Sequence, residues 1–130
     1  MRVYALIPAR SGSKGLPDKN VLEIDGHPLM AYSIVFGRAL AIDRVLVSTD
    51  SERYAEIGRR YGAECPFLRS EAASSDASRE EDILADLDAR LPAHGVELAD
   101  VWVWLKPSSP FRSVAKVQLQ FRGRRSASGL

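Results

Sequence analysis

Short apolar runs alternate along this chain with stretches in which apolar residues recur every three or four positions. The runs are rich in β-branched residues, which is typical of buried parallel strands, whereas the periodic stretches are typical of amphipathic crossover helices. The predicted strands are residues 2–7, 44–48 and 101–105. This alternation predicts an α/β fold with a mostly parallel sheet.

The first two helices are expected on either side of the second strand. Residues 29–40 place their apolar side chains on one helical face, and Pro28 suits a first helical position. Thr49 and Glu52 form a candidate capping box that opens the second helix, and Gly62 is suited to close it.

A third helix is expected after a less regular stretch. Residues 65–68 suggest a short extended piece, and residues 69–77 a polar loop. Ser78 and Glu81 then form a second candidate capping box, and the apolar stripe that follows continues to Pro92.

Composition excludes several classes of protein. The 130 residues are 45% hydrophobic and 27% charged, which is too apolar for intrinsic disorder. A net charge of +1 argues against binding nucleic acid by bulk electrostatics. The single cysteine, Cys65, excludes an internal disulfide, and the opening apolar run of residues 3–7 is too short to cross a membrane. A cytoplasmic location is therefore the default expectation.

The last eighteen residues differ in charge from the rest. Residues 113–130 hold four basic residues and no acidic one, whereas residues 1–112 carry a net charge of about −3. Such a shift is typical of a solvated or disordered end, which is the prediction here.

The segment with the most chemical information is residues 8–20, which follows the first predicted strand. Open α/β sheets bind their ligands at this position. Its glycines allow backbone N–H groups to face an anion, and Arg10, Lys14 and Lys19 supply three cations. The segment lacks the two common phosphate-loop patterns, so a polyphosphate would be held by loop amides and side chains. A solvated surface loop is the alternative.

Four blocks of sequence resemble the acylneuraminate cytidylyltransferases, which include the CMP-sialic acid synthetases and their legionaminic and pseudaminic relatives. They are residues 6–20, 47–50, 62–69 and 105–112. Their order and spacing match the family across residues 3–112. The resemblance implies a Rossmann-like, three-layer α/β/α nucleotidyltransferase fold. It also implies transfer of a cytidylyl group from CTP to a sialic-acid-like nonulosonic acid, with release of pyrophosphate.

The resemblance also implies which residues act. Arg10 and Lys19 match the family's catalytic phosphate contacts, where their charges would stabilise the leaving pyrophosphate. Arg69 matches a position that borders the base, and its fixed fork of donors suits a polar base edge. The other nucleotide-binding positions that match are Pro8, Ala9, Ser13, Lys14, Asn20, Ser78 and Lys106.

Some of these residues have two interpretations. Asp50 is either a helix cap, which we favour, or a charge near the site, and Ser78 is likewise favoured as a cap over a ligand contact. Lys106 stands where relatives usually have glutamine, so a neutral contact to the nucleotide would have become cationic. Arg112 either meets the nucleotide or faces water.

Residues 1–112 are therefore expected to form the CTP-binding part of a cytidylyltransferase domain, with residues 113–130 lacking a family counterpart. The family implies Mg²⁺, but its acidic ligands, much of the sugar pocket and the arm that joins two subunits lie beyond the match. The family's homodimer is for that reason not carried over. The tail is open to three interpretations: an artificial shortening, a shifted reading frame or a naturally short protein.

Three functions stay open at this point. They are a CMP-sugar-forming enzyme, a non-catalytic nucleotide-binding module, and a related transferase for another base or sugar, such as the eight-carbon Kdo enzymes. No protein metal site is expected, because His27 and His94 have no ligands at suitable spacing. Cys65 is expected to have no His or basic neighbour that lowers its pKa and to be a buried small hydrophobe, while Trp102 and Trp104 are expected in the core.

Overall fold

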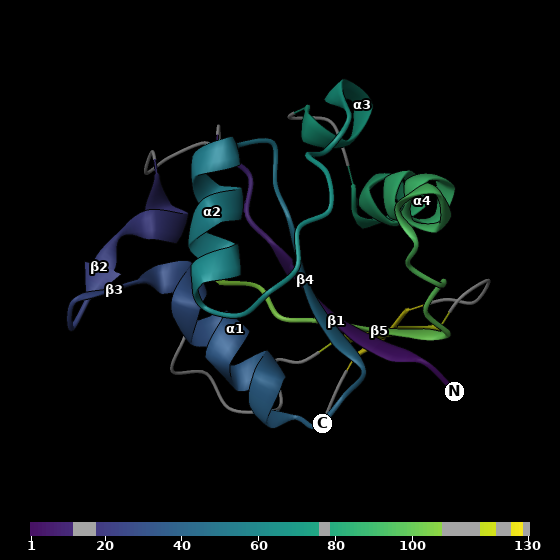
Figure 1. The fold of residues 1–130 in the computed structure, drawn as a ribbon, viewed down its shortest axis with the longest axis horizontal. Coiled ribbons are helices and arrows are strands. Elements are labelled where there is room, and N and C mark those ends of the chain that lie inside the picture. Colours follow the sequence, from purple (N-terminus) through teal and green to yellow (C-terminus); the bar gives the residue numbers. More distant parts are fainter. Residues whose placement is uncertain (12–17, 76–78, 108–117, 122–125, 129–130) are drawn as a thin grey trace.

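The computed structural model describes residues 1–11, 18–75, 79–107, 118–121 and 126–128, and its centre is a five-stranded sheet (Figure 1). The strand order is β4-β1-β5-β6-β7. The first three of these pair in parallel and the last two antiparallel. Their bounds are β1 (Val3–Pro8), β4 (Arg44–Ser48), β5 (Val101–Trp104), β6 (Gln118–Phe121) and β7 (Ser126–Ser128).

Helices cover both faces of the parallel strands. Figure 1 shows α1 and α2 on one side of the sheet and α4 on the other. Their bounds are α1 (Leu29–Ala39), α2 (Glu52–Arg60), the short α3 (Glu71–Ser74), α4 (Glu80–Arg90) and the 3₁₀ turn η2 (Leu91–His94). The three-layer α/β/α arrangement predicted from the sequence is confirmed.

The two core clusters follow from the alternation of side chains along each strand. On the face that carries α1 and α2, Ala5 and Ile7 pack with Val103 and with the buried side of both helices. On the opposite face, Leu6 and Trp104 pack against the apolar stripe of α4. Both tryptophans of β5 lie on this second face, each only 1% exposed, so the prediction that they belong to the core is confirmed.

The order in which strands are added to the sheet reverses at β1, which has β4 on one side and β5 on the other. It leaves β1 through α1 to reach β4 on one side, and later returns through α4 to β5 on the other side. In open α/β sheets the helices diverge at such a reversal, and ligands bind at the carboxyl ends of the strands there. The fold therefore places the residues that follow Pro8 at the position expected for a ligand.

Helix starts differ from the predicted capping boxes. The N-cap of α2 is Ser51, whose hydroxyl accepts a hydrogen bond from the Tyr54 N–H, so neither Thr49 nor Asp50 is the cap. The strand ends at Ser48, and the chain needs the next two residues to turn toward the helix. The N-cap of α4 is Arg79, whose backbone N–H donates to the Asp82 carboxylate, so the predicted cap at Ser78 is wrong.

One further segment differs from the prediction. The expected polar loop at residues 69–77 contains α3, because the Ser70 hydroxyl caps its first turn by accepting from the Ala73 N–H. Just before the expected extended piece at residues 65–68, Glu64 forms an isolated parallel bridge to Leu46 of β4.

The basic tail contains two strands, which corrects the expectation of a solvated or disordered end. Residues 118–121 pair with β5, and residues 126–128 pair with β6. A strand at the edge of a sheet presents unpaired N–H and C=O groups, and another strand satisfies them. The expectation of a disordered end was based on the net charge of the tail. Backbone hydrogen bonding between strands does not depend on that charge.

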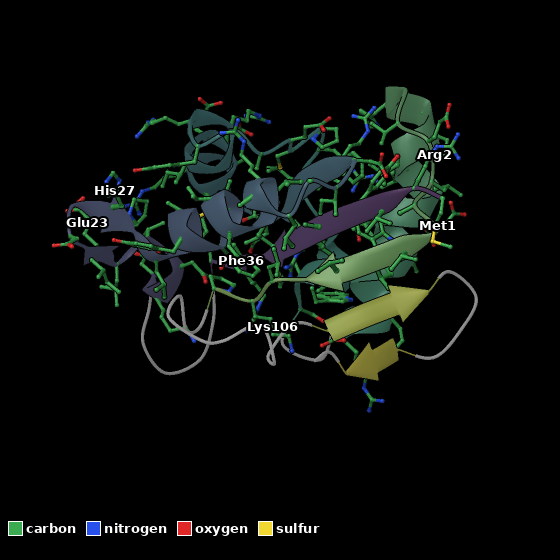
Figure 2. All side chains as sticks on the ribbon, turned by 90° about the horizontal axis from the view of Figure 1, so that it is seen from below. Met1, Arg2, Glu23, His27, Phe36 and Lys106 are labelled. Carbon is green, nitrogen blue, oxygen red and sulfur yellow. The ribbon has the colours of Figure 1, made fainter. Side chains whose placement is uncertain are left out.

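A small hairpin of β2 (Glu23–Ile24) and β3 (His27–Pro28) was not predicted. Its turn residues, Asp25 and Gly26, both have positive φ, at 56° and 81°, as a tight two-residue hairpin turn requires. Figure 2 shows Glu23 and His27 at one end of the molecule, with Met1 and Arg2 at the other. The hairpin thus lies at the same end as the carboxyl ends of the strands.

Candidate functional site

The two ends of segment 8–20 are joined at the carboxyl end of β1. Ala9 is fully buried, and its N–H donates to the Ser48 carbonyl over 2.9 Å, which keeps it beside β4. Asn20, in the 3₁₀ turn η1 (Lys19–Val21), is 7% exposed, and its Nδ2 donates to the Arg10 carbonyl over 3.1 Å. The side-chain amide of Asn20 therefore closes the segment, in addition to any contact with a nucleotide.

Asp50 is bound to the other side of the same segment. Its Oδ1 accepts from the Ser11 N–H over 2.9 Å, and its Oδ2 accepts from the Ser11 hydroxyl over 3.1 Å. The favoured interpretation of Asp50 as a helix cap is thus wrong. The carboxylate instead connects the end of β4 to the residue that follows Arg10.

Arg69 is held by groups of the protein. Its Nε and one terminal nitrogen donate to the hydroxyl and the carbonyl of Ser48 over 2.8 and 3.0 Å, and the other terminal nitrogen donates to the Ala73 carbonyl over 3.4 Å. Burial lowers the pKa of Arg69 to about 10, which still leaves the guanidinium charged at neutral pH. Recognition of a base by Arg69 stays a prediction. The three hydrogen bonds fix the orientation of its guanidinium group.

Charges of both signs meet around Arg69. After burial, the largest influences on the pKa of Arg69 are Asp50, which raises it, and Arg10, which lowers it. The three side chains are therefore close enough to interact electrostatically. Together with Ser11 and Ser48 they form the strand-end cluster, which is Arg10, Ser11, Ser48, Asp50 and Arg69.

Lys19 lies at the start of η1, at the other end of segment 8–20 from Arg10, and its surroundings differ from those of the cluster. It is half-buried, and its ammonium group makes no hydrogen bond or ion pair with any residue that the structure describes. The neighbouring Asp18 is instead bound to the Tyr54 hydroxyl and faces Arg53 at 3.9 Å. The Lys19 charge is thus not neutralised by a described carboxylate.

Lys106 follows β5 and forms an ion pair with Glu80 at the start of α4, with Nζ and Oε1 2.9 Å apart. Its charge is partly compensated within the protein. A direct contact with a nucleotide stays a prediction. Pro8 is the last residue of β1, one position beyond the end of the predicted strand, while Ser13, Lys14, Ser78 and Arg112 lie outside the described residues.

The remaining reactive side chains have structural surroundings. The Nδ1 of His27 contacts the Tyr61 hydroxyl, and that of His94 contacts the Arg90 carbonyl. Cys65 is buried, as predicted, but Arg59 lies nearby and donates to its carbonyl, so the expectation of no basic neighbour is wrong. Burial outweighs that charge and raises the pKa of the Cys65 thiol.

In the part of the chain that the structure describes, no three His, Cys, Asp or Glu side chains come together as a metal site. None of the helices in those same ranges has both the length and the apolar character that a membrane crossing requires.

Tyr54 gives a test of the contact that holds the far end of segment 8–20. Burial, and then the hydrogen bond to Asp18, raise the pKa of Tyr54 to about 12. A raised pKa means that the folded state favours the neutral phenol. Its stabilising effect is complete below pH 10, where the unfolded tyrosine is also neutral, and is lost as pH rises toward 12.

We therefore expect the urea midpoint of the wild-type chain to fall more steeply between pH 10 and 12 than that of Tyr54→Phe, which cannot ionise. The measurement is circular dichroism at a series of pH values. Tyr61→Phe removes a hydroxyl that contacts His27 on the surface and should follow the wild type. Identical pH profiles for wild type and Tyr54→Phe would show that the buried phenol contributes nothing.

Sequence reasoning missed Ser11, Ser48 and Tyr54 as parts of this site. A signal existed for the first two, because Ser48 ends a predicted parallel strand, Ser11 lies in the segment that follows another, and the carboxyl ends of such strands share one edge of a sheet. Tyr54 lies within the predicted second helix, where the sequence pattern does not indicate a contact with Asp18. Its hydroxyl reaches Asp18 because α2 packs on the face of the sheet beside η1.

The fold and the site define a class: a doubly wound α/β protein with basic side chains at the carboxyl ends of its parallel strands. A family model described as cytidylyltransferase matches residues 4–112. The chain belongs to the cytidylyltransferase family.

Curated relatives have related names. A CMP-N,N'-diacetyllegionaminic acid synthase of Legionella pneumophila is 41% identical over 113 residues, which are 86% of this chain and 48% of the relative. An N-acylneuraminate cytidylyltransferase of Escherichia coli is 39% identical over 112 residues, 85% of this chain and 25% of the relative. A pseudaminic acid cytidylyltransferase of Campylobacter jejuni is 42% identical over 77 residues, which are 58% of this chain and 33% of the relative. The chain thus spans about half or less of these relatives' lengths.

Solved structures agree on the fold. A CMP:2-keto-3-deoxy-manno-octonic acid synthetase in complex with CTP superposes with a TM-score of 0.64 and 27% identity, covering 86% of this chain and 42% of that one. A cytidylyltransferase from Leptospira borgpetersenii gives a TM-score of 0.57 at 24% identity, covering 85% and 43%. The Rossmann-like nucleotidyltransferase fold is confirmed.

Proposed function

We propose that this chain is the CTP-binding part of an enzyme that transfers a cytidylyl group from CTP to an acidic nine-carbon sugar. The observation that carries the proposal is the strand-end cluster, which sets Arg10 and Arg69 at the topological reversal of a cytidylyltransferase fold. The names of the relatives supply the sugar class, since they act on legionaminic, N-acylneuraminic and pseudaminic acids. The structural neighbour that holds CTP supports the nucleotide.

In the proposed reaction, the anomeric hydroxyl oxygen of the sugar bonds to the α-phosphorus of CTP. The bond from that phosphorus to the bridging oxygen breaks, pyrophosphate leaves with the bonding electrons, and the hydroxyl proton passes to solvent or a base. Negative charge grows on the pyrophosphate, and cations placed there in advance lower the barrier. Arg10 and Lys19 are proposed for this role, with Ser13 and Lys14 beside them.

The remaining predicted contacts fit around the same nucleotide. Ala9 and Pro8 would present backbone groups at the end of β1, and Asn20 would contribute the oxygen of its amide, since its Nδ2 is bound to Arg10. Arg69 is proposed to face the base, while Lys106 and Ser78 are proposed nearby.

Mg²⁺ is predicted to accompany CTP, but the described residues do not fit a protein-held metal, since no three suitable side chains meet among them. Action in the cytoplasm, without nucleic acid or membrane, is also part of the proposal.

The test is a calorimetric titration of the chain with CTP, UTP, GTP and ATP. We expect CTP to bind most tightly, and absence of binding by all four would overturn the proposal. Adding Mg²⁺ and N-acetylneuraminic acid to CTP and measuring pyrophosphate then separates the alternatives. Release identifies an enzyme, whereas binding without release favours the non-catalytic module.

A further inference from the structure

Both oxygens of the Asp50 carboxylate accept hydrogen bonds from Ser11, a residue of the proposed phosphate-binding segment 8–20. The backbone N–H of Ser11 donates to Oδ1 of Asp50, and the hydroxyl of Ser11 donates to Oδ2. Two hydrogen bonds from one residue to one carboxylate fix both the position and the rotation of that residue, and bonds to a charged acceptor are about twice as strong as neutral ones. Arg10 precedes Ser11 directly, so its backbone is fixed as well.

The role of Asp50 is not explained by the helix that follows. The N-cap of α2 is Ser51, and the Thr49 hydroxyl accepts from the Ser51 N–H within the turn. Asp50 makes its described hydrogen bonds to Ser11, which is 39 residues away in the sequence. The contact connects the ends of the neighbouring strands β1 and β4.

The same carboxylate also acts on the guanidinium group of Arg69, where its effect is opposite to that of Arg10. Arg10 disfavours the charged form of Arg69, and Asp50 favours it. Before a polyphosphate arrives, the site must keep two like charges close together in a partly buried place. A carboxylate beside them reduces this repulsion without filling the position of the ligand.

We propose that Asp50 is a positioning residue that holds Arg10 and Ser11 in the arrangement that receives the phosphates of CTP. The inference rests on the proposed function. Its physical basis is that a site ordered before binding does not lose conformational entropy when the ligand binds. Asp50 is proposed to act through Ser11, from which each of its two oxygens accepts a hydrogen bond.

Two substitutions of Asp50 separate the effect of its hydrogen bonds to Ser11 from the effect of its negative charge. Asp50→Asn keeps an acceptor for the Ser11 N–H and offers an N–H to the Ser11 hydroxyl, but removes the charge. Asp50→Ala removes both the hydrogen bonds and the charge. A carboxylate that acts only through its charge would repel a triphosphate, so either substitution would then tighten CTP binding. Positioning predicts the opposite sign for alanine.

The experiment measures two properties of each variant. Amide hydrogen exchange at Ser11, followed by NMR without ligand, is expected to accelerate about tenfold in Asp50→Ala and to stay near wild type in Asp50→Asn. Calorimetry is expected to show about tenfold weaker CTP binding for Asp50→Ala and wild-type or tighter binding for Asp50→Asn. A tenfold change corresponds to about 1.4 kcal/mol.

Asp43 is the matched control. Its Oδ2 accepts from the Val3 N–H over 2.7 Å, a carboxylate–amide bond at the opposite end of β1. Asp43→Ala should lower stability to a similar degree and leave CTP affinity unchanged. Should Asp50→Ala fail to fold, Ser11→Ala, which keeps the backbone bond and loses the hydroxyl, is expected to weaken CTP binding about threefold.

Tighter CTP binding by Asp50→Ala, or unchanged exchange at Ser11 in that variant, would overturn the inference. Weaker CTP binding by Asp43→Ala to the same extent would overturn it too, since the loss would then follow stability alone. A wild-type chain that binds no CTP removes the proposed function, and with it the nucleotide role of Asp50. The exchange measurement, made without ligand, distinguishes that failure from a failure of the tether.

Discussion

Replacing Trp104 with alanine should lower the free energy of unfolding by about 3–5 kcal/mol, the usual cost of removing a large aromatic side chain from a packed core. Trp104 is 1% exposed and lies in the cluster that joins the sheet to α4, beside Leu84 and Leu87. Its pairing partner on the adjacent strand β1 is Leu6, which is fully buried. Since small domains have about 5–15 kcal/mol of total stability, this loss is a large fraction of the total, and the urea midpoint should fall markedly.

Urea denaturation followed by tryptophan fluorescence and circular dichroism measures this cost. Trp104→Phe keeps an aromatic ring and should lose less than half as much. Val35→Ala changes a side chain that is 55% exposed on α1, and surface changes of this kind usually stay within about 0.5 kcal/mol. A urea midpoint for Trp104→Ala equal to that of Val35→Ala would contradict the packing described for β5.

Arg10→Ala should weaken CTP binding about 10- to 100-fold while leaving stability unchanged or slightly higher. A hydrogen bond to a charged group contributes about 1.5–3 kcal/mol, which corresponds to this range of affinity. Stability should not fall, because Arg10 disfavours the charged form of Arg69 in the unliganded protein. Loss of affinity with a gain in stability is expected where a site keeps like charges together for a ligand.

Calorimetry with CTP and urea denaturation on the same sample measure both quantities. Arg10→Lys keeps the charge but loses the planar fork, so it should bind with intermediate affinity. Arg60→Ala removes an exposed arginine of α2 and should bind CTP as the wild type does. Equal affinities for Arg10→Ala and Arg60→Ala would show that Arg10 does not hold phosphate.

The position of the site was predictable, but the partners of its side chains were not. Arg69 was expected to present its donors to a base, and the structure shows three of its hydrogen bonds going to Ser48 and Ala73. Asp50 was interpreted as a cap because the residue type suits one, yet it binds Ser11. In both cases residue type indicates which bonds can form, and spatial proximity decides which do.

The hairpin at residues 23–28 shows a signal that was present and not used. Asp-Gly between two short extended pieces is a strong local indication of a two-residue hairpin turn, because both residues accept positive φ. Asp25 and Gly26 adopt it. The pairing of residues 118–121 with β5, by contrast, had no comparable signal, because it satisfies the backbone of an edge strand rather than a side-chain preference.

The alternation of β1, α1, β4, α2, α4 and β5, the buried tryptophans and the position of the segment at residues 8–20 were determined by sequence alone, since apolar periodicity and glycine content act locally. The tertiary structure decided that Ser11 meets Asp50, that Tyr54 meets Asp18, and that Lys106 pairs with Glu80. These contacts join residues far apart in the chain. They exist because β1, β4 and β5 end at one edge of the sheet, and strand order is set by how helices pack on both faces.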